Sequence, residues 1–407
     1  MSHTILNLRH LRAFCEVARC QSISGAASQV YLSQPAITQA LAKLERVLDI
    51  ALFDRKNNGM FVTEPGQLFL NRVKRALAYI NEGTRAAAKV ASKSRSGGFR
   101  HFDQLLTSAQ LRALLAVSDA GNFSLAARNI GVSQPSLHRM ARDLERLSGV
   151  LFFDKVPQGI KLTSAAQALA YSARLAFSEL RQAGEEIDAW KGLDTGEIMV
   201  GTMPLARTFI LPTAVKHLLE MRPQTRVKII DGPYDDLLHG LRHGELDLLV
   251  GALRDPLPID DVEQTALFSD PLAIVARHDH PLAGKKSISV ADLANFPWIV
   301  PRQTTPTRGQ FEALFNDTAS GVPTRLVESS SLIFIRGLLL ESDHLTIISG
   351  HQVRHEENQH LLRRLNVDLD HTSRAIGITV RKNWQPTKTQ SLLLDLLAQA
   401  SQQIDLD

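Results

Sequence analysis

The stretch Ser33-Gln-Pro-Ala-Ile-Thr-Gln-Ala-Leu-Ala-Lys-Leu-Glu-Arg46 decides how the first part of this 407-residue chain is expected to fold. Serine is a favoured helix N-cap and proline is tolerated in a first helical turn, so a helix is predicted to begin at Ser33. Ile37, Leu41 and Leu44 recur at helical spacing and predict a buried stripe. The opposite side of this helix is polar and slightly basic, as expected of an outward face.

The residues before this helix complete a compact unit. Leu8, Leu11 and Phe14 predict an earlier helix, and Ser24 is expected to cap a short one that leads into a turn at Tyr31. This order predicts a helix-turn-helix that presents its last helix outward. Gln and Thr on such a helix can hydrogen-bond base edges in the major groove, although a merely solvated face has the same polarity. The candidate DNA contacts are Ser33, Gln34, Pro35, Thr38, Gln39 and Lys43.

A β-hairpin is predicted directly after the outward helix. Asn57-Asn-Gly59 is a turn signal between two short apolar runs. Arg55 and Lys56 lie at the base of this wing, where they are placed to meet phosphates. Residues 1–65 are therefore expected to be a winged helix-turn-helix DNA-binding domain.

A long amphipathic helix is predicted from Gly66 to about Val90. A helix of this length beyond a small domain needs a partner for its apolar stripe, so dimerisation through it is expected. A flexible basic linker follows at Ser92–Gly98. Residues 66–100 are assigned to the helix and this linker.

The chain then repeats itself at a spacing of one hundred residues. Ser33-Gln-Pro35 returns as Ser133-Gln-Pro135, and Leu44-Glu-Arg46 as Leu144-Glu-Arg146. The register never slips, so a second helix-turn-helix domain is expected at 101–163 and a second linker helix at 164–194. The alternative for this copy is a dimerisation spacer. Its candidate DNA contacts are Ser133, Gln134, Pro135, His138, Arg139 and Arg142.

Charge is distributed unevenly along the chain. Residues 1–100 carry 15 Lys and Arg against 6 Asp and Glu, residues 101–194 carry 10 of each, and residues 195–407 carry 21 against 26. A basic head on an acidic body is typical of a polyanion-binding domain joined to a non-binding one.

From Thr195 onward, strands and helices alternate. Glu197–Thr202, Arg226–Asp231 and Leu246–Gly251 are predicted strands with helices between them. This alternation predicts a parallel α/β sheet. The fold class is therefore multidomain, with two all-α-rich winged helix-turn-helix domains followed by an α/β domain over residues 195–407.

Several separated motifs resemble one bacterial family. Ser33-Gln-Pro-Ala-Ile-Thr38, Leu52-Phe-Asp-Arg55 and Thr63-Glu-Pro-Gly66 look like the winged helix-turn-helix signature of LysR-type transcription regulators. The C-terminal half resembles the effector domain of that family, on motifs such as Gly244-Glu-Leu-Asp-Leu248 and His280-Pro-Leu282. Its features are most similar to the branch that contains the galactose-binding-protein regulator.

This resemblance covers nearly the whole chain. It implies a regulator that binds double-stranded DNA as a homodimer or homotetramer, under control of a small-molecule effector. It also implies that the C-terminal domain has two lobes, as in the type 2 periplasmic-binding-protein fold. The second copy departs from the pattern, because Thr163-Ser-Ala-Ala166 lacks the family's glycine and family members normally have one head. Its wing is therefore expected to be incomplete.

Ligands of such α/β sheets bind beyond the carboxyl ends of the strands, where helix N-termini offer free N–H groups. Hydroxyl groups and an arginine near these positions suit a sugar or a small carboxylate. The serines can equally be helix caps and the arginine a surface charge. The candidate effector-binding residues are Met203, Pro204, Leu205, Tyr234, Leu253, Thr304, Thr305, Arg308 and Ser330.

Other classes of function have little support. No apolar run is long enough to cross a membrane and no export signal begins the chain, so a cytoplasmic protein without a membrane partner is expected. Cys15 and Cys20 are expected to be reduced core thiols.

No metal, cofactor or enzymatic activity is expected. His239 and His243 lie four apart on a predicted helix, but no third ligand accompanies them at motif spacing. No phosphate-binding glycine loop, nucleophile elbow or acid–base pair is recognisable. The alternative function is a small-solute sensor or binding protein that does not bind DNA.

Overall fold

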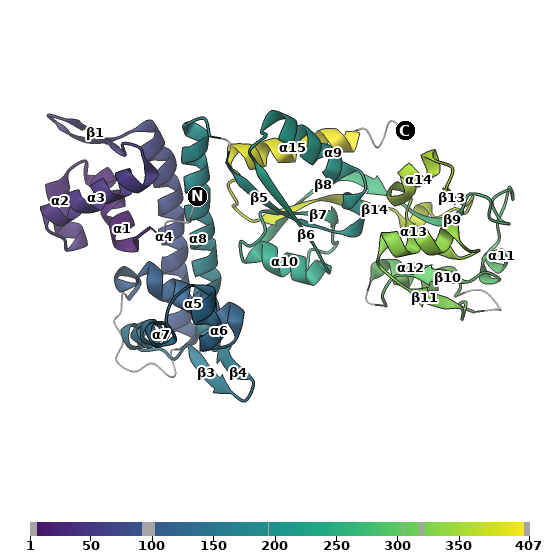
Figure 1. The fold of residues 1–407 in the computed structure, drawn as a ribbon, viewed down its shortest axis with the longest axis horizontal. Helices are drawn as coiled ribbons and strands as arrows, with labels where there is room; N and C mark the ends of the chain where they lie inside the picture. Colours follow the sequence, from purple (N-terminus) through teal and green to yellow (C-terminus); the bar gives the residue numbers. More distant parts are fainter. Residues whose placement is uncertain (1–5, 92–101, 194, 304, 317–320, 403–407) are drawn as a thin grey trace. The chain divides into compact units, whose positions relative to one another are not determined.

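The computed structural model describes residues 6–91, 102–193, 195–303, 305–316 and 321–402. The chain divides near Gly196 into an N-terminal and a C-terminal compact unit (Figure 1). The linker predicted at Ser92–Gly98 lies outside the described residues. No helix in the described part of the chain is long and apolar enough to cross a membrane.

The N-terminal unit begins with three short helices, a hairpin and a long helix. Ser22, rather than the expected Ser24, caps the second helix, because its hydroxyl accepts the Gly25 N–H at 3.3 Å. Ser33 and Thr63 cap the third helix and the long helix, as helix-terminal donors require. The elements are α1 (Leu8–Cys20), α2 (Ile23–Val30), α3 (Gln34–Leu48), β1 (Phe53–Lys56), β2 (Gly59–Val62) and α4 (Glu64–Val90).

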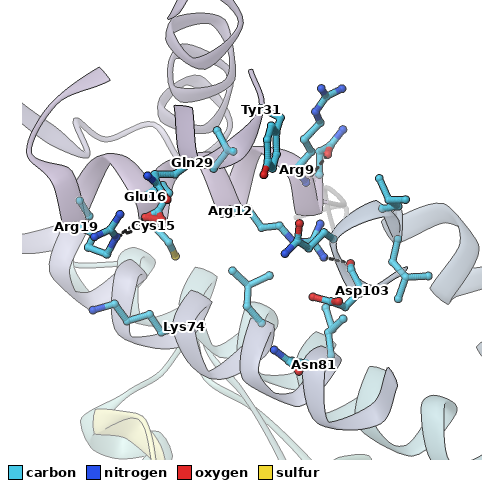
Figure 2. Close-up of a pocket in the computed structure, with 18 of the residues that line it drawn as sticks. Arg9, Arg12, Cys15, Glu16, Arg19, Gln29, Tyr31, Lys74, Asn81 and Asp103 are labelled. Atoms are coloured by element: carbon cyan, nitrogen blue, oxygen red, sulfur yellow. Dashed lines mark hydrogen bonds and ion pairs between the residues drawn. The ribbon is translucent and has the colours of Figure 1, made fainter. Parts of the chain in front are cut away.

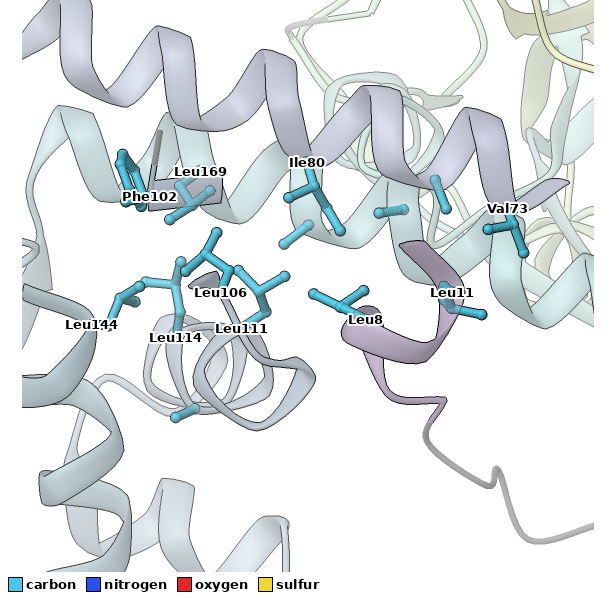
Figure 3. Packing of buried hydrophobic residues seen from close by; sticks show 14 of the residues in the cluster. Leu8, Leu11, Val73, Ile80, Phe102, Leu106, Leu111, Leu114, Leu144 and Leu169 are labelled. Atoms are coloured by element: carbon cyan, nitrogen blue, oxygen red, sulfur yellow. The ribbon is translucent and has the colours of Figure 1, made fainter. Parts of the chain in front are cut away.

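The same order of elements follows one hundred residues later, after a short 3-10 helix at Phe102–Leu105. The buried side chains of both parts form one continuous hydrophobic cluster. Figure 3 shows it running from Leu8 on α1 past Ile80 on α4 to Leu106 and Leu111. The elements of the second part are α5 (Ser108–Ala120), α6 (Phe123–Asn129), α7 (Gln134–Ser148), β3 (Phe153–Val156), β4 (Gly159–Leu162) and α8 (Ser164–Trp190).

The long helices α4 and α8 pack on each other and run antiparallel (Figure 1). Arg72, near the start of α4, bonds Gln182 near the end of α8, whereas Gly83 in the later part of α4 approaches Ser172 in the first part of α8. Dimerisation through the apolar stripe of α4 was expected, and in the structure α8 of the same chain packs on that stripe. The repeat supplies a second helix with a matching stripe on the same chain, and that helix covers α4.

The C-terminal unit contains two five-stranded sheets, each flanked by helices. In the first sheet β5 pairs in parallel with β6 and β7, but β14 pairs antiparallel with β7 and β8. The sheet is therefore mixed, and the prediction of a parallel sheet holds only for its first three strands. Its order is β6 (Arg226–Asp231), β5 (Glu197–Thr202), β7 (Leu248–Ala252), β14 (Arg374–Arg381) and β8 (Val262–Asp270).

The second sheet has its own core around the fully buried Trp298. Its order is β11 (Leu326–Glu328), β10 (Trp298–Val300), β12 (Leu345–Ser349), β9 (Leu272–Arg277) and β13 (Leu362–Arg364). Pro271 alone separates β8 of the first sheet from β9 of the second, so the chain crosses between the two cores there. The helices of the unit are α9 (Ile210–Met221), α10 (Tyr234–Arg242), α11 (Val290–Ala294), α12 (Pro306–Leu314), α13 (Leu332–Leu340), α14 (Arg354–Asn358) and α15 (Lys388–Gln402).

Candidate DNA interface and effector site

Helix α3 presents the predicted polar face to solvent. Ile37, Leu41 and Leu44 are buried, and this apolar stripe fixes the rotation of the helix, so the opposite, polar side faces solvent. Thr38 is half-buried and its hydroxyl donates to the Gln34 carbonyl at 3.0 Å. The candidate DNA contacts on this helix that are exposed are Ser33, Gln34, Pro35, Gln39 and Lys43.

The wing of the first part forms as predicted. Strands β1 and β2 pair antiparallel from Phe53 with Val62 to Lys56 with Gly59. Arg55 and Lys56 are exposed, and the Lys56 ammonium lies 5.4 Å from the centre of the Phe61 ring. Both cations are therefore available to a polyanion beside α3.

A glutamate on each third helix fixes the wing, and sequence reasoning missed it. Glu45 accepts the Leu52 N–H at 2.9 Å, and Glu145 accepts the N–H groups of Phe152 at 2.8 Å and Phe153 at 3.2 Å. The recurrence of Leu-Glu-Arg at a spacing of one hundred residues was the signal for this role.

Helix α7 also exposes its predicted face, but with different chemistry. His138 is half-buried and stacks on Phe123 with ring centres 3.9 Å apart; burial and the nearby Arg142 and Lys155 lower its pKa. Gln134 accepts a hydrogen bond from Ser124 at 3.1 Å. The exposed residues of this face include Ser133, Gln134, Pro135, Arg139, Arg142 and Arg146.

Carboxylates of the same helix engage two of the three outward arginines. Arg142 pairs with Glu145 at 2.7 Å, and Arg146 pairs with Asp143 at 2.8 Å. The described residues give Arg139 no such partner. Of the three, Arg139 is thus the most available to an external anion or base.

The second wing is complete, contrary to the expectation from its missing glycine. Strands β3 and β4 pair in the register of the first wing, from Phe153 with Leu162 to Val156 with Gly159. The hairpin is anchored elsewhere: the Ile160 N–H donates to the Gly121 carbonyl at 2.7 Å. The family's glycine matters at another place, because a Cβ on Gly66 would lie 2.4 Å from the Leu52 carbonyl oxygen.

Gly159→Ala is expected to destabilise this wing by about 1–3 kcal/mol. Gly159 has a φ of +135°, and a Cβ there would lie 2.5 Å from the Gly121 carbonyl oxygen. Gly184→Ala in α8 is the matched control: with no neighbour within 4 Å of its Cβ, it should gain up to about 1 kcal/mol. Denaturant unfolding of both variants checks the difference, and equal effects would contradict this role of Gly159.

A cavity of about 880 Å³ lies beside the first part, between α1, α4 and the 3-10 helix (Figure 2). Arg12 closes one side by donating to the Asp103 carbonyl. Cys15 also lines it, and burial raises the pKa of its thiol to about 12, so the thiol stays protonated. Both cysteines are free, as expected. The cavity does not include the exposed face of α3.

The candidate effector residues of the first sheet follow its strands. Met203, Pro204 and Leu205 come directly after β5, and the buried Leu205 contributes to the core. Tyr234 begins α10 after β6, with its ring 4.2 Å from the Arg254 guanidinium. Leu253 follows β7, and its N–H donates to the Ala375 carbonyl at 2.9 Å.

The candidates of the second sheet lie at the starts of two helices, α12 and α13. Thr305 caps α12 by accepting the Arg308 N–H at 3.3 Å. Arg308 is buried and donates to Glu312 at 2.7 Å and to the Pro301 carbonyl at 3.3 Å. Ser330 is exposed before α13, which Ser331 caps. Thr304 lies outside the described residues.

A buried polar cluster, which the sequence did not single out, joins the two sheets. Arg374, the first residue of β14, donates to the Thr307 hydroxyl on α12 at 3.1 Å. Asp270 is fully buried at the end of β8, where Ser349 donates to it at 2.8 Å and Arg374 lies 3.9 Å away. Arg374 Nε and Asp270 Oδ2 have no hydrogen-bond partner.

The charge of Arg254 acts on Arg374, so Tyr234 and Leu253 lie near the same cluster. Through Thr307, the first turn of α12 lies there too. Tyr234 and Leu253 are thus linked to this cluster through Arg254, and Thr305 through Thr307, whereas the contacts of the described residues include none between Ser330 and Arg374. Within the described residues, no group of three or more His, Cys, Asp and Glu could hold a metal.

Three regions of the chain match known families. Residues 191–402 match the family described as the LysR substrate binding domain. Residues 8–67 and 108–167 each match the family described as bacterial regulatory helix-turn-helix protein, lysR family.

Several characterised regulators are similar in sequence. The HTH-type transcriptional regulator GalR of Pseudomonas putida is 32% identical over 375 residues, 92% of this chain and 92% of that protein. PcaQ of Agrobacterium fabrum is 30% identical over 303 residues, 74% of this chain and 96% of that protein. GbpR of Azospirillum brasilense is 25% identical over 240 residues, 59% of this chain and 70% of that protein.

Among solved structures, a full-length OxyR variant from Pseudomonas aeruginosa has a similar fold. The TM-score is 0.53 at 23% sequence identity, and the likeness covers 73% of this chain and 95% of that chain.

Proposed function

The chain belongs to the LysR family of DNA-binding transcription regulators and carries the family's effector-binding domain, and from this we propose that both of its helix-turn-helix units contact DNA. The second match to the helix-turn-helix family, one hundred residues after the first, carries this proposal. It is supported by the equal order of elements and by the outward position of α3 and α7. Two tandem copies of one winged helix-turn-helix domain account for both observations.

The first unit is the principal reader of base sequence. Gln39 is exposed in the middle of the outward face, where a glutamine can make two hydrogen bonds to an adenine. Thr38 already bonds the Gln34 carbonyl, so it contributes less. Lys43, Arg55 and Lys56 are exposed around this face and bind phosphates.

The second helix-turn-helix unit contacts DNA with more arginine side chains and fewer amide side chains than the first. Arg139 occupies the position of Gln39 and has no carboxylate partner among the described residues. Arg142 and Arg146 reach phosphates only by exchanging their partners Glu145 and Asp143 for them. The Arg146–Asp143 pair is exposed and contributes only about 0–1 kcal/mol, so Arg146 can readily exchange its partner, whereas Glu145 is 7% exposed and holds Arg142 more firmly.

A gel shift with the full chain on fragments of its genome tests the proposed function. Specific retention of a few fragments at physiological salt, with unlabelled bulk DNA as competitor, is the expected result. Retention of no fragment above the others would favour the alternative, a small-solute sensor or binding protein that does not bind DNA.

Arg55→Ala is expected to weaken binding to all DNA sequences alike and to lower the salt slope by about 1. Arg55 is exposed at the base of the wing, where it would neutralise one phosphate. Titrations at several salt concentrations give the slope. Lys216→Ala, on an exposed position of α9, is the charge-matched control and should leave the slope unchanged. A slope equal to that of the wild type in Arg55→Ala would contradict the wing contact.

The effector of the C-terminal unit is a small carboxylate, bound beside Arg374. Arg374 is half-buried, its Nε is buried and has no hydrogen-bond partner, and Arg254 adds a second positive charge nearby. Thr305 begins the adjacent helix, whose N-terminus favours an anion. A sugar is the second candidate, because hydroxyl groups of Thr305 and Thr307 also suit it.

Thr305→Ala and Ser330→Ala separate these positions. We expect Thr305→Ala to weaken effector binding by about tenfold, because one hydrogen bond to a charged group is lost. Ser330→Ala should reduce effector affinity less, because no contact of the described residues links Ser330 to Arg374. Thermal shift against small carboxylates and sugars identifies a ligand, and calorimetry gives both affinities. DNA affinity without ligand should stay as in the wild type, since effector control couples separate sites. An undiminished effector affinity in Thr305→Ala would show that α12 is not part of the site. The assignments of Thr304 and Arg308 would then be wrong as well.

A further inference from the structure

The packing of α4 on α8 has an internal symmetry. Arg72 of α4 bonds Gln182 of α8. Exchanging each for its counterpart one hundred positions away gives residues 172 and 82, and Ser172 indeed packs on Gly83. Two antiparallel helices whose contacts repeat when the helices are exchanged are related by an approximate two-fold rotation. The two helix-turn-helix units that precede α4 and α8 are therefore related by it as well.

Further contacts hold the two helix-turn-helix units in this arrangement. The Ser108 hydroxyl donates to the Leu6 carbonyl at 2.6 Å, so the starts of α1 and α5 lie together. The Lys191 ammonium, just after α8, donates to the Leu48 carbonyl at 2.6 Å and lies 3.2 Å from the Asp49 carboxylate. The residue that follows α8 therefore contacts the end of α3 in the first helix-turn-helix unit.

The charges of this packing are not symmetric. Arg72, with only 3% of its side chain exposed, pairs with Glu179 at 2.9 Å and Glu186 at 2.6 Å. Arg75 also pairs with Glu179, at 2.9 Å. We call Arg72, Arg75, Glu179, Gln182 and Glu186 the charged seam. Its arginines all come from α4 and its carboxylates all come from α8.

This division opposes the pairing of like helices. By the same exchange, Arg72 in an α4–α4 pair would face residues 79, 82 and 86, which are Tyr, Glu and Ala, so it would have one carboxylate partner instead of two. In an α8–α8 pair, Glu179 would face residues 172 and 175, which are Ser and Leu, and no arginine. Buried carboxylates without a cation are strongly disfavoured, so the charged seam selects α4 with α8.

From this packing we infer that one chain forms an internal pair of DNA-binding heads that reads an inverted repeat of two unlike half-sites. The inference rests on the proposed DNA contacts of both units. A two-fold pair of heads reads half-sites in inverted orientation. In a regulator built from identical subunits the half-sites match, but here the readers differ. At three corresponding positions of the outward faces, α3 has Thr38, Gln39 and Ala42, whereas α7 has His138, Arg139 and Arg142.

The chemistry of these residues defines the two half-sites. Glutamine at position 39 suits adenine, and arginine at position 139 suits the acceptor pair of guanine. His138 is held against Phe123, so it lies flat beside the face and adds little to readout. One half-site is then read mainly at an adenine and the other mainly at a guanine.

A zero-length cross-link tests whether the heads pair within one chain. Carbodiimide joins a lysine to a carboxylate in contact, and Lys191 with Asp49 is such a pair. After treatment of the full chain, the linked 49–191 peptide is expected in the monomer band of a denaturing gel. Lys191→Arg keeps the charge but cannot be coupled, so the peptide should disappear. Absence of the peptide in the wild type, or its presence in the dimer band alone, would overturn the pairing.

Selection of bound sites from random DNA tests the unlike half-sites. The wild type and the control Lys216→Ala should both select two inverted half-sites of different sequence. Gln39→Ala should lose about tenfold preference in one half-site and Arg139→Ala about tenfold in the other. Two identical half-sites that both depend on Gln39, or a single half-site, would overturn the inference while leaving specific DNA binding intact. No selected sequence at all would overturn the proposed function as well.

Discussion

Arg72→Ala is expected to lower the free energy of unfolding of the N-terminal unit by about 3–5 kcal/mol. The substitution leaves Glu179, which is 6% exposed, with Arg75 as its remaining cation, and it removes the Arg72 partner of the partly buried Glu186. Loss of a partner from a buried ion pair costs more than the pair itself contributes, because the remaining charge cannot reach water. Hydrogen exchange of α4 and α8 amides, combined with denaturant unfolding, measures the loss where it occurs.

Two variants control this prediction. Arg19→Ala removes an arginine paired with Glu16, but that arginine is 62% exposed, so water screens the pair and the loss of stability should be far smaller than for Arg72→Ala. Combining Arg72→Met with Glu179→Gln and Glu186→Gln removes the buried charges together and should recover most of the stability. If the triple variant is as unstable as Arg72→Ala, the carboxylates are not the cause.

Arg374→Met is expected to destabilise the C-terminal unit by about 3 kcal/mol near neutral pH. Asp270 is fully buried, and Arg374 is one of the cations that face it, with His351 and Arg364. The expected loss is at the low end for a buried pair, because 28% of the Arg374 side chain is exposed and Ser349 still donates to Asp270.

The loss caused by Arg374→Met should depend on pH. Burial raises the pKa of Asp270 above its ordinary value, although Ser349, His351 and Arg374 oppose the shift. When the pKa of a carboxyl is higher in the folded state than in the unfolded state, the folded state loses stability as pH rises through the folded-state pKa. Below the unfolded-state pKa the group is protonated in both states and causes no loss. The variant should therefore approach wild-type stability in acid. Adding Asp270→Asn should make the loss independent of pH, and a pH-independent loss in Arg374→Met alone would contradict the assignment.

Much of the DNA-binding part could be predicted from local patterns. The stripe of Ile37, Leu41 and Leu44 fixes which side of α3 is buried, and the outward side follows from the helical period. The turn residues Asn57 and Asn58 likewise predicted the hairpin. These features depend on neighbours in sequence, so the sequence displays them directly.

The features that sequence reasoning missed depend on distant residues. The partner of α4 could not be read from its own stripe, because an apolar stripe does not say whether α8 or a second chain covers it. The second wing looked incomplete because the glycine at position 66 was taken to support the hairpin. In the structure Gly159 and Gly121 support it, and position 66 lies against Leu52 instead. Arg374 and Asp270, 104 positions apart, meet only through the register of β14 with β8.

With both helix-turn-helix units bound to DNA as proposed, the covalent link between them changes how the amount of regulator sets the occupancy of its operator. When two separate chains must meet on weakly occupied DNA, occupancy rises with the square of their concentration, whereas a linked pair makes it rise in proportion. Dilution of the protein, for instance by growth of the cell, then lowers occupancy gradually rather than steeply. On the proposed pairing, the packing of α4 on α8 would make operator occupancy depend on the effector more than on how many copies of the chain are present.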